Sequence, residues 1–116
     1  MKRMERINEQ LRSELSNLIE QKLDWDKGLI TIVRVKCSPD LSQATINISV
    51  LPENVSGTAL RKLRSQNQEF AQILGKKLNL KRIPRFHWKI DWTERRAAEI
   101  NKILEQIRND KNETSS

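Results

Sequence analysis

Hydrophobic residues recur at helical spacing along the first part of the chain. Over residues 3–22 they are separated mostly by three or four positions, so all of them fall on one stripe of a helix. They are Met4, Ile7, Leu11, Leu15, Leu18 and Ile19. The opposite side mixes arginines with glutamates, among them Arg3, Arg6, Glu5 and Glu14. We therefore predict an amphipathic helix with a core-facing stripe and an outer face of mixed charge.

The pattern then changes to strict alternation, which is typical of strands with one buried face. Val33, Val35 and Cys37 share one phase, while Arg34 and Lys36 occupy the other. After a turn at Ser38-Pro39-Asp40, the apolar residues Ala44, Ile46, Ile48 and Val50 alternate with polar ones. The connection is short, so these segments predict an antiparallel pair of strands with one wet face.

From Thr58 onward the spacing is helical again, but one member of the stripe is polar. The stripe runs Leu60, Leu63, Asn67, Phe70, Leu74 and Leu78. In an unbroken helix Asn67 would face the core, and a buried amide without partners is costly. We therefore predict a break near Gln66-Asn67-Gln68, where these side chains bond freed backbone groups. The flank beside the break is polar and largely basic, with Arg61, Lys62, Ser65, Gln68, Gln72 and Lys76.

The last third of the chain predicts a loop, a strand and a helix. A basic loop at 79–83 is closed by Pro84, after which Phe86, Trp88 and Ile90 alternate with Arg85, His87 and Lys89. Asp91 or Thr93 can cap a final helix that reaches Ile107 and carries the stripe Ala97, Ile100, Ile103, Leu104 and Ile107. Residues 108–116 have nothing to bury and are expected to be a disordered polar tail. The order predicts one α+β domain over 1–107, with helices on one face of a three-stranded sheet.

Amino-acid composition excludes several classes of function but says less about the fold. Hydrophobic residues make up 36% and charged residues 32%, which is enough for a small core. No apolar run approaches the roughly 18–20 residues of a membrane span, and the N-terminus does not look like a secretory signal. One cysteine and one histidine cannot make a Cys/His zinc site, and the three glycines build no phosphate loop. We expect a cytoplasmic protein that is not an enzyme and has no metal or cofactor, with Cys37 as a buried thiol.

The positive charge is concentrated in one stretch. Residues 61–89 hold nine Lys and Arg against the single acid Glu69, whereas the remaining residues hold 13 basic and 14 acidic side chains. Such segregation favours a surface for a polyanion. The candidates for phosphate contact are Arg3, Arg6, Arg61, Lys62, Arg64, Lys76, Lys77, Lys81, Arg82 and Arg85.

Two further roles for this charge are compatible with the sequence. The basic residues could form a solvated face, or they could dock an acidic protein partner. DNA binding is disfavoured because no helix pair has a short helix-turn-helix connection. His87 could stack on a base, although an exposed strand histidine without a role fits the pattern as well.

Three segments carry a resemblance to a known family. The first is Val35-Lys36-Cys37-Ser38-Pro39-Asp40-Leu41, followed by Ala44 and Ile46; the second runs from Leu74-Gly75-Lys76 to Pro84; the third spans Phe86 to Asp91 with Thr93. Together with the element order they resemble ribosome-binding factor A, a bacterial small-subunit assembly factor with a type II KH-like fold. The likeness extends over nearly the whole chain up to Ile107.

The resemblance implies a non-enzymatic factor that binds 16S rRNA in the immature 30S subunit and assists its late maturation. We expect a monomer, because the sequence suggests neither a coiled coil nor a long exposed apolar strand. The Gly-x-x-Gly loop of ordinary KH domains is missing here, as it is in this family. The family's Ala-x-Gly kink falls on Gln66-Asn67-Gln68, and its basic residue after the kink on Ala71. The resemblance therefore implies a kinked helix pair with a changed kink sequence.

Overall fold

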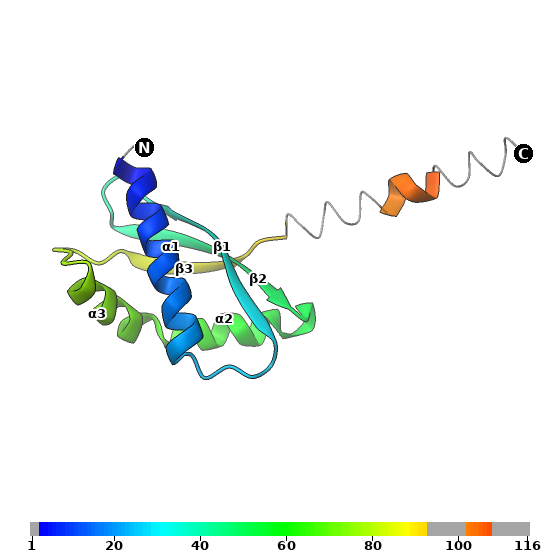
Figure 1. The fold of residues 1–116 in the computed structure, drawn as a ribbon, viewed down its shortest axis with the longest axis horizontal. Coiled ribbons are helices and arrows are strands. Elements are labelled where there is room, and N and C mark those ends of the chain that lie inside the picture. The colour runs from blue at the N-terminus through cyan, green and yellow to red at the C-terminus, as the bar shows by residue number, and fades with distance from the viewer. Residues whose placement is uncertain (1–2, 93–101, 108–116) are drawn as a thin grey trace, which may run out of the picture.

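The computed structural model describes residues 3–92 and 102–107. Its elements follow the predicted order (Figure 1). They are α1 (Arg3–Lys22), β1 (Leu29–Cys37), β2 (Gln43–Leu51), the short 3-10 helix η1 (Glu53–Val55), α2 (Ser56–Ser65), α3 (Asn67–Lys77) and β3 (Arg85–Ile90). The fold is thus α+β with a KH-like order of elements, as the sequence predicted.

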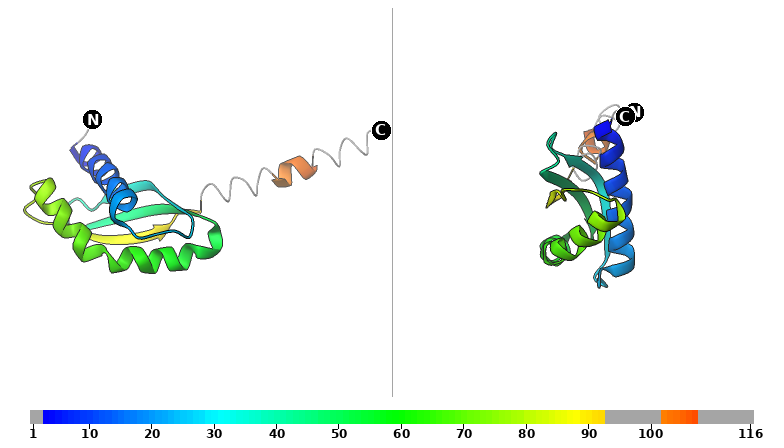
Figure 2. Two further views of the ribbon diagram at one scale, coloured as in Figure 1. Left: turned by 60° about the horizontal axis from the view of Figure 1, so that its bottom comes forward. Right: turned by 90° about the vertical axis from the view of Figure 1, so that its left-hand side faces the viewer.

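The sheet has three strands in the order β1-β2-β3. β1 and β2 are antiparallel, as expected, whereas β3 lies parallel to β2. The helices pack on one face of this sheet, as the end-on view in Figure 2 shows. The core between the layers takes Leu11 and Leu15 from α1, Ile46 and Ile48 from β2, and side chains from α2, α3 and β3. None of the described helices covers the opposite face of the sheet, which we call the open face.

The alternation predicted for the first strand is wrong at Val33. The register between β1 and β2 shifts between Ile32 and Arg34, so Val33 is an extra residue in a β-bulge. Val33 is 41% exposed, and Ile32 (6% exposed) takes the place on the core face that the sequence pattern gave to Val33. Arg34 and Lys36 still point to the outer face, as predicted, because Val35 and Cys37 are buried.

The predicted break in the long helix is confirmed. α2 ends at Ser65, α3 begins at Asn67, and Gln66 between them has φ −99° and ψ 0°. α2 starts at Ser56, two residues before the expected Thr58. α3 ends at Lys77 and is followed by Asn79, whose φ of 52° turns the chain into the basic loop.

Part of the predicted C-terminal helix lies outside the described residues. Residues 93–101 and 108–116, which include Thr93, Ala97, Ile100 and the expected tail, are not described. Residues 102–107 are helical, but Ile103, Leu104 and Ile107 are 48–55% exposed, so this part of the stripe is not buried in the core. Among the described helices, none combines the length and apolarity needed to cross a bilayer.

Candidate nucleic-acid interface

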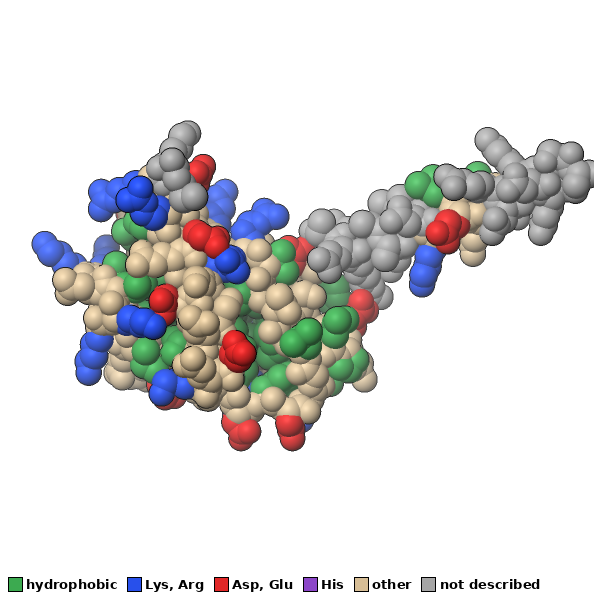
Figure 3. All heavy atoms as spheres, viewed as in Figure 1, with side chains coloured by type: hydrophobic (Ala, Val, Ile, Leu, Met, Phe, Trp, Pro, Cys, Tyr) green, Lys and Arg blue, Asp and Glu red, His purple; other side chains and the backbone are tan. Residues whose placement is uncertain are grey.

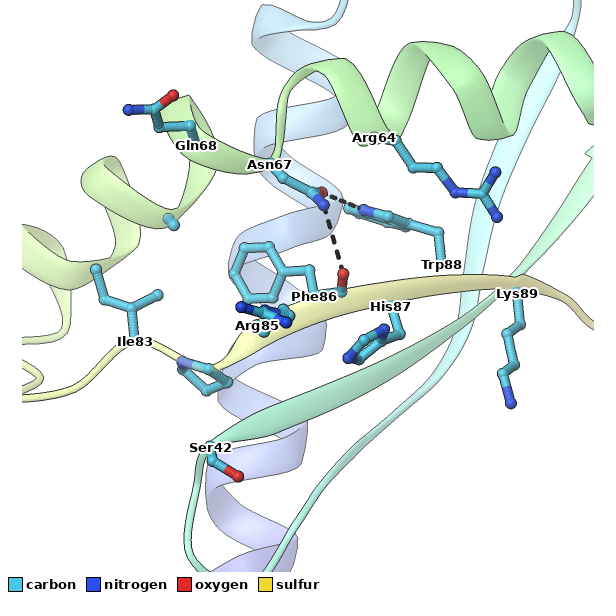
Figure 4. Close-up of a pocket in the computed structure, with 12 residues that line it drawn as sticks. Ser42, Arg64, Asn67, Gln68, Ile83, Arg85, Phe86, His87, Trp88 and Lys89 are labelled. Atoms are coloured by element: carbon cyan, nitrogen blue, oxygen red, sulfur yellow. Dashed lines mark hydrogen bonds between the residues drawn. The ribbon is translucent and has the colours of Figure 1, made fainter.

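A groove of about 950 Å³ runs between the α2–α3 break and strand β3. Arg64, Asn67 and Gln68 line it from the helices, and residues 83–89 line it from the strand and the loop before it (Figure 4). Ser42 closes it on the side of β2. The groove exists because β3 is an edge strand and the helix pair turns away at Gln66.

Asn67 fastens the break to β3. The indole Nε1 of Trp88 donates a hydrogen bond to Asn67 Oδ1 at 2.5 Å, and Asn67 Nδ2 donates to the backbone oxygen of Phe86 at 3.4 Å (Figure 4). The prediction that Asn67 needs partners at a break is therefore confirmed. The predicted partners were wrong, because the amide bonds the strand opposite rather than freed helix backbone.

The groove carries cations on both sides. Arg64 stands on the helical side, and Arg85 and Lys89 stand on the strand side; all three are exposed. His87 lies between the last two and is half-buried, and its Nε2 atom is buried without a hydrogen-bond partner among the described residues. The groove therefore combines positive charge with a buried imidazole nitrogen of His87 that has no hydrogen-bond partner among the described residues.

A second group of cations lies at one end of the molecule, where α3 passes into the loop before β3. Lys76, Lys77, Lys81 and Arg82 are all exposed there. Arg3 and Arg6 are exposed at the start of α1, and α1 and α3 are in contact. In Figure 3 Lys and Arg side chains gather at this end, whereas Asp and Glu lie over α1 and towards the other end. We call Lys76, Lys77, Lys81 and Arg82 the end cluster.

One cation of the end cluster already has a partner. Lys77 Nζ lies 2.7 Å from Glu14 Oε2 of α1, and the Glu14 side chain is only 20% exposed. This pair ties α3 to α1. The Lys77 side chain is still 58% exposed, so a phosphate would share or compete for its ammonium group with Glu14.

The remaining predicted cations lie on α2. Arg61 donates a hydrogen bond to Thr58 Oγ1 at 3.3 Å and stands one turn before Arg64. Lys62 is half-buried. Neither lines the groove. The structure thus brings Arg64 and Arg85 together, gathers the end cluster nearby, and leaves Arg61 and Lys62 outside the groove.

The sequence reasoning missed Lys89 as a lining residue and Trp88 as a hydrogen-bond donor. A signal for Lys89 was present, because alternation puts it on the same strand face as Arg85. No signal along the sequence links Trp88 to Asn67, since the two are 21 positions apart.

The thiol of Cys37 is buried in the core. Cys37 is 5% exposed, burial raises the pKa of its thiol, and its backbone N–H donates to Asn8 Oδ1 at 2.9 Å. A buried thiol with a raised pKa is a poor nucleophile. In the part of the chain that the structure describes, no three His, Cys, Asp or Glu side chains are grouped so that they could hold a metal ion.

The sequence of this chain is similar to proteins of one known family. The family model of ribosome-binding factor A matches residues 3–104. Ribosome-binding factor A of Pseudomonas aeruginosa is 31% identical over 108 residues, covering 90% of this chain and 84% of that protein. The Chloroherpeton thalassium protein of the same name is 33% identical over 117 residues, covering 98% and 90%.

Solved structures show the same fold. The crystal structure of ribosome-binding factor A from Thermus thermophilus superposes with a TM-score of 0.68 at 23% identity, covering 75% of this chain and 93% of that one. A Thermus thermophilus homology model, fitted into a cryo-EM map of a complex of the 30S subunit with that factor, has a TM-score of 0.62 at 23% identity, covering 73% and 91%. With a family model that spans most of its length and relatives above 30% identity, this chain belongs to the ribosome-binding factor A family.

Proposed function

We propose that this protein binds 16S rRNA in the immature 30S subunit in the cytoplasm and assists late maturation of that RNA without catalysis, acting as a monomer. The observation that carries the proposal is the end cluster, which presents four exposed cations on one short segment beside the basic groove. The Thermus thermophilus relative, fitted into the map of a 30S complex, supports the choice of partner.

The physical contribution of these residues is electrostatic. Each Lys or Arg that meets a phosphate releases counterions, so binding is strong at low salt and falls as salt rises. The loop at 79–83 is irregular, so it can follow folded RNA whose deep major groove side chains cannot read. Binding of this kind stabilises one RNA conformation over others, which is how an assembly factor can act without catalysis.

The test compares two charge reversals of equal size. Lys81→Glu with Arg82→Glu alters the end cluster, and Lys22→Glu with Lys27→Glu alters two exposed cations outside the end cluster and the groove. We expect the first variant to bind 16S rRNA at least tenfold more weakly than the second at equal salt, with both remaining folded by circular dichroism. With about five phosphates neutralised, the wild-type log–log slope of affinity against salt should be roughly −4.

Equal affinities of the two variants would overturn the end cluster as the RNA contact. Co-sedimentation with small subunits that survives complete nuclease digestion would favour the alternative, a basic surface that docks an acidic protein.

A further inference from the structure

The open face of the sheet carries cations on both edge strands. Arg34 and Lys36 stand on β1, Arg85 and Lys89 stand on β3, and all four are exposed. The three strands contain no Asp or Glu. This face points away from the helices, since the residues that alternate with these cations are buried in the core. Figure 4 shows His87 and Lys89 directed from β3 to the side opposite Trp88.

The strand register arranges these side chains in rows. Arg34 pairs with Asn47, which pairs with Lys89; in the next row Lys36 pairs with Thr45, which pairs with His87. Neighbouring strands are about 4.8 Å apart and alternate residues on one strand about 7 Å, so the cations frame an area roughly 10 Å wide. Hydroxyl and amide groups of β2 fill the middle.

The β-bulge lies directly before the β1 side of this frame. With Ile32 and Val35 both on the core face, the extra residue Val33 resets the phase of the strand. Arg34 then stands on the open face directly after the bulge. Arg34 and Lys36 reach the open face because they alternate with the buried Val35 and Cys37.

Acids border the frame at the turn end, beside β1 and at Asp91, which directly follows β3. At the turn end, the Asp40 carboxylate accepts hydrogen bonds from Ser38 and Ser42. At the β1 border, Glu9 of α1 is paired with Arg12, and Glu5 lines the same shallow hollow as Arg34 and Lys36. Between described residues, no ion pair involves any of the four cations of the frame.

We propose that this open face is a second RNA-binding surface that holds the phosphodiester backbone of a segment other than the one at the end cluster. The inference rests on the proposed function and extends it, because a domain that contacts phosphates both at the end cluster and across the sheet face can hold two RNA segments, even though the two surfaces adjoin at the segment from Lys81 to Lys89. The frame comprises Arg34, Lys36, Arg85 and Lys89, with Thr45, Asn47 and His87 able to hydrogen-bond phosphate or ribose between them.

The composition of the face favours RNA over an acidic protein. Cores of protein–protein interfaces are poor in charge and rich in aromatic anchors, whereas interfaces with nucleic acid are polar and strongly positive. Between the rows of cations the face offers polar side chains of β2 and one imidazole. Its exposed apolar residues are Val33, beside Arg34 at the bulge, and Leu29 and Leu51, which pair with each other at the far end of β1 and β2.

The first experiment neutralises the β1 side of the frame. Arg34→Gln with Lys36→Gln is compared with Lys22→Gln with Lys27→Gln, which removes the same charge from elsewhere on the surface. We expect the frame variant to bind 16S rRNA about tenfold more weakly than this control and its salt slope to be smaller by about 2, one unit for each lost phosphate contact. Equal affinity and slope in the two variants would overturn the proposal.

The end-cluster variant keeps the two proposals separate. If Lys81→Glu with Arg82→Glu weakens binding while the frame variant matches its control, the sheet surface is wrong and the proposed function stands. If no variant and no wild-type protein binds RNA, both fail.

The second experiment uses the unaltered protein. Lysine acetylation read by mass spectrometry should show Lys36 and Lys89 protected when immature small subunits are bound, with Lys22 and Lys27 still reactive. Reactive Lys36 and Lys89 in the complex would overturn the proposal. Protection that persists after nuclease digestion would also overturn it, because the occupant of the face would then be a ribosomal protein.

Discussion

At the scale of single residues, Asn67 joins the break in the helix to the sheet. Its side chain satisfies the buried indole N–H of Trp88 and reaches the backbone of Phe86. A polar side chain on an otherwise apolar stripe is costly unless such partners exist. Asn67 indicated the break in the sequence, because burying its amide in an unbroken helix would have been unfavourable.

Replacing Asn67 tests this role. Asn67→Ala leaves the Trp88 N–H without its acceptor, and we expect the free energy of unfolding to fall by about 1–3 kcal/mol. Urea denaturation measures the change. Trp88→Phe removes the donor instead, and in that background Asn67→Ala should cost clearly less. Equal costs in both backgrounds would show that the hydrogen bond contributes nothing.

Asp40 makes the stability of the fold depend on pH in the acid range. Hydrogen bonds from the hydroxyls of Ser38 and Ser42 and from the Ser42 backbone N–H favour its charged form and lower its pKa from 3.8 to about 2. Because the folded pKa lies below the unfolded value, the stabilisation is complete above about pH 4 and is lost as the pH falls towards 2.

The test is the melting temperature measured between pH 5 and pH 2. Asp40→Asn should lose less stability over this window than the wild type, because the variant has no carboxylate there to protonate. Asp26→Asn removes an exposed carboxylate with no hydrogen bond among the described residues and should follow the wild-type curve. A wild-type curve for Asp40→Asn as well would contradict the assignment.

At the scale of elements, α3 is packed closely on the segment that carries the basic loop. A Cβ atom added at Gly75 would lie 2.5 Å from Ile83 Cδ1 and 3.0 Å from its Cγ1, whereas one added at Gly57 would meet nothing within 4 Å. The glycine inside α3 therefore allows close approach of the chain next to Lys81 and Arg82. This close packing against Ile83 accounts for a glycine inside the helix.

The two glycines form a matched pair of tests. Gly57→Ala should raise the free energy of unfolding by about 0.4–1 kcal/mol, because it reduces the freedom of the unfolded chain. Gly75→Ala gains the same entropy but must displace Ile83, and overpacking costs about 1–3 kcal/mol. Adding Ile83→Val, which removes Cδ1, should relieve part of that cost. Equal stabilisation by the two alanines in thermal denaturation would refute the packing argument.

At this scale, what the sequence could predict depended on the spacing of its apolar residues. Helical and alternating spacings located the helices and strands, and Asn67 located the break. The sequence did not indicate the bulge at Val33, because an apolar residue that continues the alternation resembles a core residue whether or not the strand register shifts. The groove needed the pairing of β3 along β2 and the turn of α3 at Gln66, and those are relations in space that no local pattern contains.

At the scale of the whole molecule, the cations of one sequence stretch occupy more than one surface. The end cluster, the groove and the open sheet face share the loop and strand from Lys81 to Lys89. Charge counted along the chain predicted a basic protein with a basic segment. It could not predict that Lys77 is paired, because Glu14 lies in a helix 63 positions earlier.

The pair between Glu14 and Lys77 predicts a gain in RNA affinity when it is broken from the acidic side. Lys77 is exposed and Glu14 is partly buried, and solvent still screens the pair, so its contribution is on the order of 1 kcal/mol; Lys77 loses about that much when it leaves Glu14, and the acid also repels phosphates nearby. Glu14→Gln should therefore bind 16S rRNA up to about fivefold more tightly at low salt, with the advantage shrinking as salt rises. Glu20→Gln removes the same charge from an exposed position on α1. No ion pair between described residues involves Glu20, so this variant should gain less affinity.

Binding isotherms of the two variants at several salt concentrations measure the difference in affinity. Identical affinities would mean that Lys77 stays with Glu14 in the complex, and that the end cluster meets RNA with Lys76, Lys81 and Arg82 alone.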